Sequence, residues 1–219
     1  AAERARLLIE QAEALGEPTE DPLLLFSVLY GIWVANFVAF NGDVARDLAA
    51  QFLKLARKQQ RAALLLMAHR MTGYSLFMTG EIKKGLAHQD EAIAIYKPAD
   101  HAPLGTRFGQ DTRVSVLCQR SWSLWTLGYP DKALADAEDA VRYARKIGHV
   151  ATLMYGLFHA AFPYLLCGEI TAANSLVDQL AVLASEKDAV FWKAGATYMR
   201  AWIVSQSGAA TDVLSAISA

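Results

Sequence analysis

Apolar residues recur along the chain with the period of an α-helix, in segments of helix length separated by a few polar or glycine-containing residues. No run alternates apolar and polar residues as a half-buried strand does. The pattern therefore predicts an all-α chain of about eleven helices, paired as antiparallel hairpins. The predicted helices lie near residues 3–15, 22–40, 43–59, 61–79, 81–97, 112–127, 130–147, 150–167, 169–186, 189–207 and 209–218.

The chain repeats itself at intervals of about 40 residues. The marker of each repeat is a glycine between two helical segments, and the five markers are Gly42, Gly80, Gly128, Gly168 and Gly208. Glycine at this place favours a left-handed residue that ends the first helix of a hairpin. A small residue lies seven positions before each marker: Ala35, Gly73, Ser121, Ala161 and Ala201. A small residue there lets the next helix approach closely.

These repeats predict one helical-repeat domain over residues 1–219, an α-α superhelix with units near 1–20, 21–60, 61–111, 112–148, 149–187 and 188–219. The third unit is longer, because residues 97–112 carry two prolines and two glycines that break the helical period. Arg107, Gln110 and Asp111 are the candidate functional residues of this loop (98–111). The alternative is a plain connection in which Asp111 caps the next helix.

Composition narrows the partners. The formal net charge is −1, and the basic clusters on the second helices are interleaved with acids, which argues against nucleic acid. Two charge-free stretches, 23–40 and 150–168 (apart from the titratable His159), are long enough to be membrane spans. We favour buried helices, because the stretches contain Asn36 and Pro163 and keep the phase of the repeat. Two distant cysteines indicate unpaired thiols and a reducing, cytoplasmic setting.

No motif for catalysis or for a cofactor is present. The sequence has no phosphate-binding loop, no H-E-x-x-H, no C-x-x-C and no G-x-S-x-G. No two histidines are four residues apart, as a helical metal site would require. We therefore expect no catalytic residue, no cofactor and no metal.

One face of the predicted first helices is unusually aromatic. Positions ten, six and three before each marker share a helix face. Its candidate residues are Asn36, Arg70, Tyr74, Phe77, Trp122, Trp125, Phe158, Phe162, Tyr198 and Trp202. The face is either a groove for a peptide or small ligand, or a set of rings that bury one another. Arg70, its one cation, is expected to meet an acidic group or to pair with Asp90 or Glu91.

The pattern of a small residue, then an apolar residue, then Leu-Gly, then Ala-Leu resembles the tetratricopeptide repeat (TPR). The best copy is SWSLWTLGYPDKALADAEDAV, from Ser121 to Val141. The runs FGQD at 108–111, SLWTLGYPDKAL at 123–134 and FW at 191–192 look like the helical C-terminal region of large bacterial signalling proteins. Those proteins carry a class III adenylate/guanylate cyclase domain and an AAA-type ATPase domain before TPR-like repeats.

The resemblance implies a non-catalytic interaction and regulatory module of a longer protein. Its partner would be a protein or peptide segment, including the sister domains of its own chain. The alternative is a small-molecule or peptide sensor of a transcriptional regulator that uses the aromatic face. Both ends of the array look cut, so we also expect that two copies can pair through them.

Overall fold

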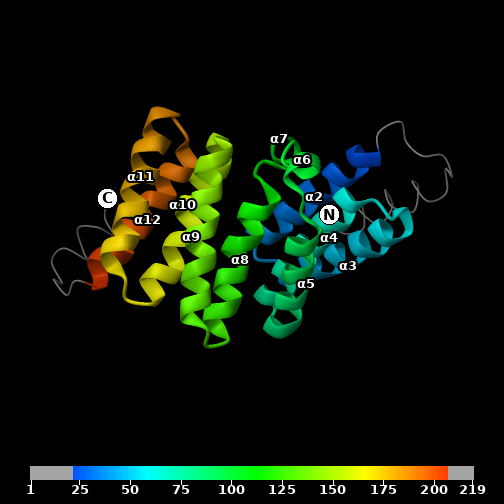
Figure 1. Ribbon diagram of the computed structural model, residues 1–219, viewed down its shortest axis with the longest axis horizontal. Coiled ribbons are helices and arrows are strands. Elements are labelled where there is room, and N and C mark those ends of the chain that lie inside the picture. The colour runs from blue at the N-terminus through cyan, green and yellow to red at the C-terminus, as the bar shows by residue number, and fades with distance from the viewer. Residues whose placement is uncertain (1–21, 207–219) are drawn as a thin grey trace. The chain divides into compact units, whose positions relative to one another are not determined.

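The computed structural model describes residues 22–206, with side chains from Phe26 onward, and this part is entirely helical (Figure 1). Its helices are α2 (Pro22–Val38), α3 (Gly42–Gln59), α4 (Ala62–Met78), α5 (Ile82–Ile95), α6 (Pro98–His101), α7 (Leu104–Phe108), α8 (Thr112–Thr126), α9 (Pro130–Ile147), α10 (Val150–Leu166), α11 (Ile170–Glu186) and α12 (Val190–Gln206). The nine long helices agree with the predicted ones within two residues at each end, and the predicted helices 3–15 and 209–218 lie outside the described part.

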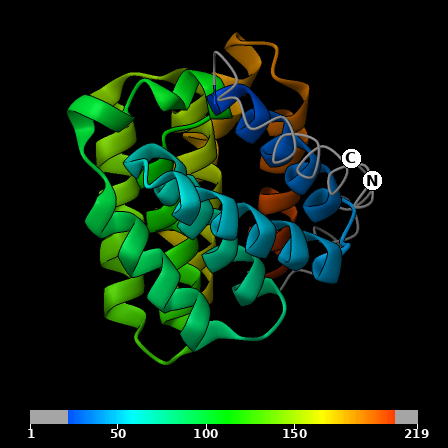
Figure 2. The same cartoon turned by 90° about the vertical axis from the view of Figure 1, so that its right-hand side faces the viewer.

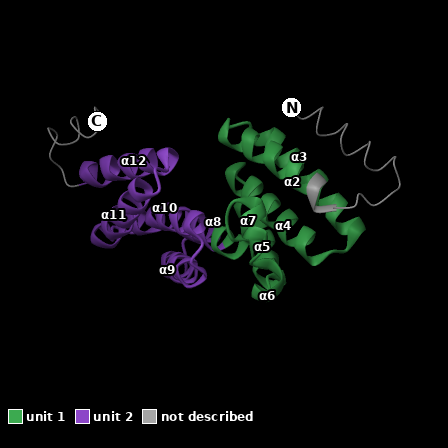
Figure 3. Cartoon of the chain, turned by 90° about the horizontal axis from the view of Figure 1, so that it is seen from above, with its two compact units in different colours: residues 1–116 green, residues 117–219 purple. Residues whose placement is uncertain are grey.

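The helices belong to two compact units, residues 1–116 and 117–219, which are described separately (Figure 3). In the first unit α2, α3, α4 and α5 pack in succession, α2 also contacts α4, and α7 contacts α2. In the second unit α9, α10, α11 and α12 pack in succession, and α10 contacts α12. The helices that contact one another in this way lie side by side in both views (Figures 1 and 2). Within each unit, the first helices of neighbouring hairpins thus lie together.

Glycine ends the first helix of three hairpins, as predicted. Gly80, Gly128 and Gly168 have φ values of 87°, 85° and 80°, in the left-handed region that side chains with a Cβ disfavour. The backbone N–H of the following residue donates to the carbonyl five residues back, for example from Glu81 to Leu76 at 2.8 Å. This bond satisfies one of the carbonyls that a helix end leaves free.

The first hairpin departs from the prediction, because its left-handed residue is Phe40 (φ 58°) and not Gly42. The bond from Asn41 N to Asn36 O (2.9 Å) is the counterpart of the Glu81 bond, whereas Gly42 is the first residue of α3. A left-handed residue with a side chain costs about 1–2 kcal/mol, which a folded protein can tolerate. The marker glycine was therefore misaligned by two residues, and the turns of the first and second hairpins are 40 residues apart.

In the first unit, α4 and α5 approach each other closely at two glycines. A Cβ added at Gly85 would lie 2.7 Å from the carbonyl oxygen of Gly73, and one added at Gly73 would lie 3.0 Å from that of Gly85. The small residue predicted seven positions before the turn thus has the expected role at Gly73. The corrected alignment places Trp33, not Ala35, at this position in α2. The position five residues after the turn is small and buried in all four hairpins: Ala45, Gly85, Ala133 and Ala173.

The stretch predicted as a loop contains two short helices, α6 and α7, which the sequence pattern missed. Pro98 begins α6, where its missing N–H costs nothing, and Gly109 ends α7 with φ 83°. Four or five residues are too few to show a helical period. The predicted cap is confirmed, since Asp111 Oδ1 accepts a hydrogen bond from the backbone N–H of Val114 at 3.1 Å. Its Oδ2 accepts one from the Tyr96 hydroxyl at 2.6 Å, which fixes the end of α5 to the start of α8.

The structure also bears on the charge-free stretches and on the cysteines. Within residues 22–206, no helix has both the length and the apolar character needed to cross a membrane. Cys118 and Cys167 are free thiols, and burial is the main cause that raises the pKa of each. The predicted unpaired thiols are confirmed, and Cys118 is buried whereas Cys167 is half-buried.

Candidate interaction face

The first helices of the second unit carry a column of three aromatic rings. Trp122 of α8, Phe162 of α10 and Trp202 of α12 each lie six residues before a predicted marker glycine. The ring centroids of Trp122 and Phe162 are 4.9 Å apart, and those of Phe162 and Trp202 are 5.7 Å apart. All three side chains are half-buried. The Trp122 indole N–H donates to the His159 carbonyl at 3.0 Å, which fixes the orientation of the ring.

One further predicted residue, Phe158, contacts this column, whereas Tyr198 and Trp125 have no ring contact with it. Phe158 contacts Phe162 edge-on, with centroids 5.3 Å apart, and is half-buried. Tyr198 is 57% exposed on α12. Trp125 instead hydrogen-bonds the Cys167 thiol at the end of α10, and this bond lowers the pKa that burial raises. The prediction thus placed four of its residues together, and Trp192, which it did not include, extends the group through a 5.8 Å contact with Phe158.

In the first unit, the predicted Tyr74 and Phe77 belong to a second group of rings. Their centroids are 6.3 Å apart, and Phe37 of α2 lies 4.6 Å from Tyr74. Trp33 stacks on Phe37 at 5.6 Å and donates its indole N–H to the Ser75 hydroxyl at 2.8 Å. The prediction missed Phe37 because of the misaligned first marker, since alignment on Phe40 puts Phe37 three positions before the turn. Trp33 lies seven positions before the turn, where the other repeats have a small residue, so neither alignment includes it in the aromatic face.

Asn36 does not share the register of the aromatic column, which corrects the prediction. It lies four residues before the turn, where the other hairpins have Leu76, Leu124 and Tyr164. Its side chain is 6% exposed, and its amide N–H donates to the Ile32 carbonyl at 2.9 Å. Its Oδ1 accepts from the Asn41 side chain at 3.3 Å. The hydrogen bonds of the Asn36 side chain therefore stay within its own helix and the turn that follows it.

Arg70 pairs with neither Asp90 nor Glu91, which corrects the expected partners. Its side chain is 1% exposed, and its guanidinium lies over the Tyr30 ring, 5.2 Å from the centroid. Nη2 donates to the Tyr30 hydroxyl at 2.9 Å. With the Gln110 amide oriented to satisfy both of its ends, the Gln110 oxygen accepts from Arg70 Nη2 and its nitrogen donates to the Phe108 carbonyl at 3.0 Å.

The three predicted loop residues all contact other parts of the first unit. Arg107 Nε donates to the Ser27 hydroxyl of α2 at 2.8 Å, and Gln110 contacts Arg70 as described. Phe108 packs edge-on against Tyr30, with centroids 5.3 Å apart. The third residue, Asp111, caps α8. The 98–111 segment therefore covers the side chains of α2 and α4 that surround Arg70.

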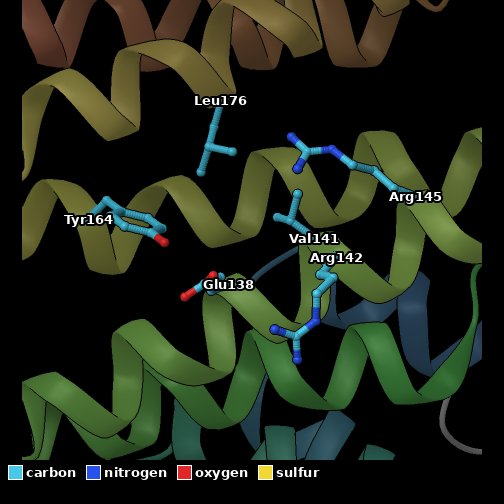
Figure 4. Close-up of a pocket in the computed structure, with 6 residues that line it drawn as sticks. All are labelled: Glu138, Val141, Arg142, Arg145, Tyr164 and Leu176. Carbon is cyan, nitrogen blue, oxygen red and sulfur yellow. The ribbon is translucent and has the colours of Figure 1, made fainter.

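The second unit also has a pocket of about 210 Å³ that was not predicted (Figure 4). It is lined by Glu138, Val141, Arg142, Arg145, Tyr164 and Leu176. Arg142 pairs with Asp139, and Arg145 donates to the Gln179 amide oxygen at 2.7 Å. Figure 4 shows the two arginines at one side and Tyr164 at the other. Both arginines are exposed, as expected for an outer face.

A neighbouring groove of about 400 Å³ is lined by Leu153, Leu157, Asp178, Gln179, Val182, Leu183 and Glu186. Gln179 of this groove accepts the hydrogen bond from Arg145, which lines the first pocket. Its lining combines apolar side chains with two acids, Asp178 and Glu186.

The first unit brings two histidines together across α4 and α5. The Nδ1 atoms of His69 and His88 are 3.2 Å apart, a hydrogen bond that needs one ring to donate and the other to accept. Burial is the first cause that lowers the pKa of each ring, which favours the neutral forms the bond requires. Within the described residues, no three histidine, cysteine or acidic side chains are placed to bind a metal ion.

Comparison with known proteins identifies the fold of the chain but not its family. No protein-family model matches the chain, and no curated protein matches it. Crystal structures of a candidate kinesin light chain of Podosopora anserina, with nearly identical TPR-like repeats, match in structure. The protein and a variant with one substitution each give a TM-score of 0.61 at 13% identity, over 91% of this chain and 94% of theirs. The chain therefore has the TPR-like helical-repeat fold.

Proposed function

We propose that the chain is a non-catalytic protein-interaction module, and that the aromatic column of the second unit binds a protein segment. The observation that supports this most is the column Trp122–Phe162–Trp202. Its three rings, one from each of three successive first helices, are in contact and only half-buried. Large, rigid rings of this kind are the commonest anchors of binding energy at protein interfaces.

The charges near the column favour an apolar segment as its occupant. On α12, Lys193 pairs with Asp188 at 2.6 Å and Arg200 pairs with Asp178 at 2.8 Å. These cations already have acidic partners within the unit. A partner would therefore contribute aliphatic, proline or aromatic side chains that pack on the rings, and its charges would contribute little.

A peptide selection against the purified chain tests this proposal. The selected segments are expected to bind the wild-type chain and to lose about tenfold or more in affinity, or at least ~1.4 kcal/mol, with Trp122→Ala or Trp202→Ala. Tyr129→Ala is the matched control, because Tyr129 is an exposed aromatic residue at the α8–α9 turn, outside the column. If no selected segment depends on either tryptophan, the column is not the binding site.

We further propose that this module regulates a larger signalling protein with cyclase and ATPase domains. The support is the resemblance of residues 108–111, 123–134 and 191–192 to the repeat region of such proteins. The reading frame around the segment is the first check. If it encodes a cyclase, co-expression with that domain should give a complex that Trp202→Ala weakens, and the isolated repeats should show no turnover. Pairing of two copies through the array ends is a separate prediction, which light scattering after gel filtration tests.

A further inference from the structure

Two histidines of the first unit face each other with the same ring nitrogen. His69 of α4 and His88 of α5 have their Nδ1 atoms 3.2 Å apart and their ring centroids 5.0 Å apart. Both side chains are half-buried, so the pair lies within reach of solvent. Because the two residues are on different helices, no spacing in the sequence marks them as a pair. The packing of α4 on α5 alone brings them together.

The distance between the two nitrogens fits a pair of ligands on one metal ion. Imidazole nitrogens bind zinc at about 2.0–2.1 Å, so two such ligands of a tetrahedral ion lie about 3.3–3.4 Å apart. The centroids are closer than they would be if both ring axes lay along the line between the nitrogens, so the axes are inclined to that line. Rotation about χ2 of histidine, a soft torsion, can direct both Nδ1 atoms to one point beside it.

The surroundings of the pair keep the rings neutral and place one carboxylate near them. Burial is the first cause that lowers the pKa of both rings, and a metal ligand must be a neutral imidazole. Glu91, three residues after His88 on α5, acts on both rings through its negative charge. Arg57 of α3 acts on both with the opposite sign and opposes a bound cation.

We propose that His69 and His88 bind one divalent transition-metal ion through their Nδ1 atoms, with zinc as the test ion. Imidazole ligands suit zinc, copper and nickel, whereas magnesium and calcium prefer oxygen. Since the part of the chain that the structure describes has no third ligand in place, water fills the other positions of the ion. The ion joins α4 to α5 and therefore stabilises the folded hairpin.

The metal ion and the hydrogen bond between the rings require different positions of the protons. In the hydrogen bond, one ring carries its proton on Nδ1 and the other ring accepts it. In the metal complex both Nδ1 atoms bind the ion, so both neutral rings carry their proton on Nε2. Zinc must therefore change the tautomer of one ring, which a change in packing alone does not require.

Calorimetric titration of the full chain with zinc, after removal of metal by EDTA and dialysis, tests the site. The wild-type chain is expected to bind one ion. His69→Gln and His88→Gln should each weaken binding at least about tenfold, because each removes a direct ligand. Glu91→Gln should weaken binding and Arg57→Gln should tighten it, both by smaller factors. The control His149→Gln, which removes a half-buried histidine of the second unit, should bind zinc as the wild type does.

Long-range ¹H–¹⁵N spectra of the wild-type chain decide the question if a histidine variant does not fold. Zinc should leave both rings of the pair protonated on Nε2, and magnesium should change neither ring. The proposal is overturned by unchanged tautomers, by no binding to the wild type, or by full binding in both histidine variants. An equal loss in His149→Gln would place the zinc elsewhere and also contradict it. Trp202→Ala should bind zinc normally, which separates this site from the aromatic column.

Discussion

The two units use the same repeat positions to build different interiors. Ten residues before the turn, α4 has the buried cation Arg70, whereas α10 has the half-buried ring of Phe158. Five residues after the turn, the first unit has Ala45 in one hairpin and Gly85 in the other, whereas the second has alanine in both of its hairpins. Buried polar side chains such as Thr72, Ser75 and Gln89 accompany Arg70. The described part of the second unit also buries polar side chains, such as Gln119 and Thr152, but no charged one.

The difference shows that a repeat fold fixes where side chains lie and leaves their chemistry free. The helical hairpin needs only a left-handed turn and a small residue at the crossing. The other positions of the first helix can carry buried polar side chains, as around Arg70, or half-buried aromatic side chains, as around Phe162. Replacing a residue of one unit by the residue at the equivalent position of the other unit therefore tests how far stability depends on the residue that each unit has.

The largest effect is expected when Gly85 receives the residue of the second unit. Gly85→Ala would place a Cβ 2.7 Å from the Gly73 carbonyl oxygen, so α4 and α5 must separate. We expect a loss of about 2–3 kcal/mol in the free energy of unfolding, measured by urea denaturation and circular dichroism. Gly31→Ala is the control, because nothing lies within 4 Å of its added Cβ and the change should stabilise α2 slightly. Equal stability of the two variants would show that the crossing adjusts freely.

The next largest effect concerns the cap of α8. Asp111→Ala places there the residue that precedes α12, Ala189. It removes the cap bond to Val114 and the bond from Tyr96, so we expect a loss of about 2–3 kcal/mol in the same measurement. Asp188→Ala removes an exposed carboxylate at the α11–α12 junction and should have little effect. A similar small effect from Asp111→Ala would contradict its structural role.

A smaller effect, of opposite sign, is expected at the first turn. Phe40 is 87% exposed and left-handed, so Phe40→Gly removes strain without emptying a core. We expect a gain of about 1 kcal/mol in the free energy of unfolding. The reverse exchange in the second unit, Gly128→Ala, should lose about as much. If Phe40→Gly destabilises the chain, then the Phe40 side chain contributes more than its exposure indicates.

The smallest effect is the pH dependence of the histidine pair. The pKa of both His69 and His88 is lowered, first by burial, then for His69 by His88 and for both by Arg57 of α3, against Glu91 of α5. The folded state therefore binds protons less readily than the unfolded state. The stabilisation is complete above a pH of about 6.5 and is lost as the pH falls toward the folded-state pKa.

Because both rings are partly exposed, we expect less than about 1 kcal/mol between pH 7.5 and 5.5. The measured quantity is the difference in unfolding free energy between the wild-type chain and His69→Gln/His88→Gln across this range. The difference should shrink as the pH falls. A constant difference would show that the pair does not titrate with folding.

The long helices and three of the turns could be predicted because each depends on local residues. A helical period of 15 or more residues is hard to mistake, and Gly80, Gly128 and Gly168 mark turns that favour glycine. The Phe40 turn could not be found this way, since a residue with a side chain takes a left-handed conformation there that the local sequence disfavours. The nearby Gly42 then misplaced Asn36 and hid Phe37.

The environment of each candidate residue was less predictable than its position. The prediction placed Trp122, Phe162 and Trp202 in one column because they occupy equivalent positions of the repeat. Such positions come together when successive first helices pack in a shared register. The same logic grouped Arg70 with them, yet its burial depends on Gln110 and Phe108, which come from a segment 40 residues later. Two helices as short as α6 and α7 leave no periodic signal, so this covering segment looked like an irregular loop.

The connections differ in how much length they can vary. Within each hairpin, three residues join the helices: 39–41, 79–81, 127–129 and 167–169. Between hairpins, the joins are 60–61, 96–111, 148–149 and 187–189. The one long connection of the described residues thus lies between hairpins, and the four turns within hairpins have the same length. A protein engineer who wants to insert a fluorescent reporter or a second binding domain should choose 148–149 and leave the turns within the hairpins intact.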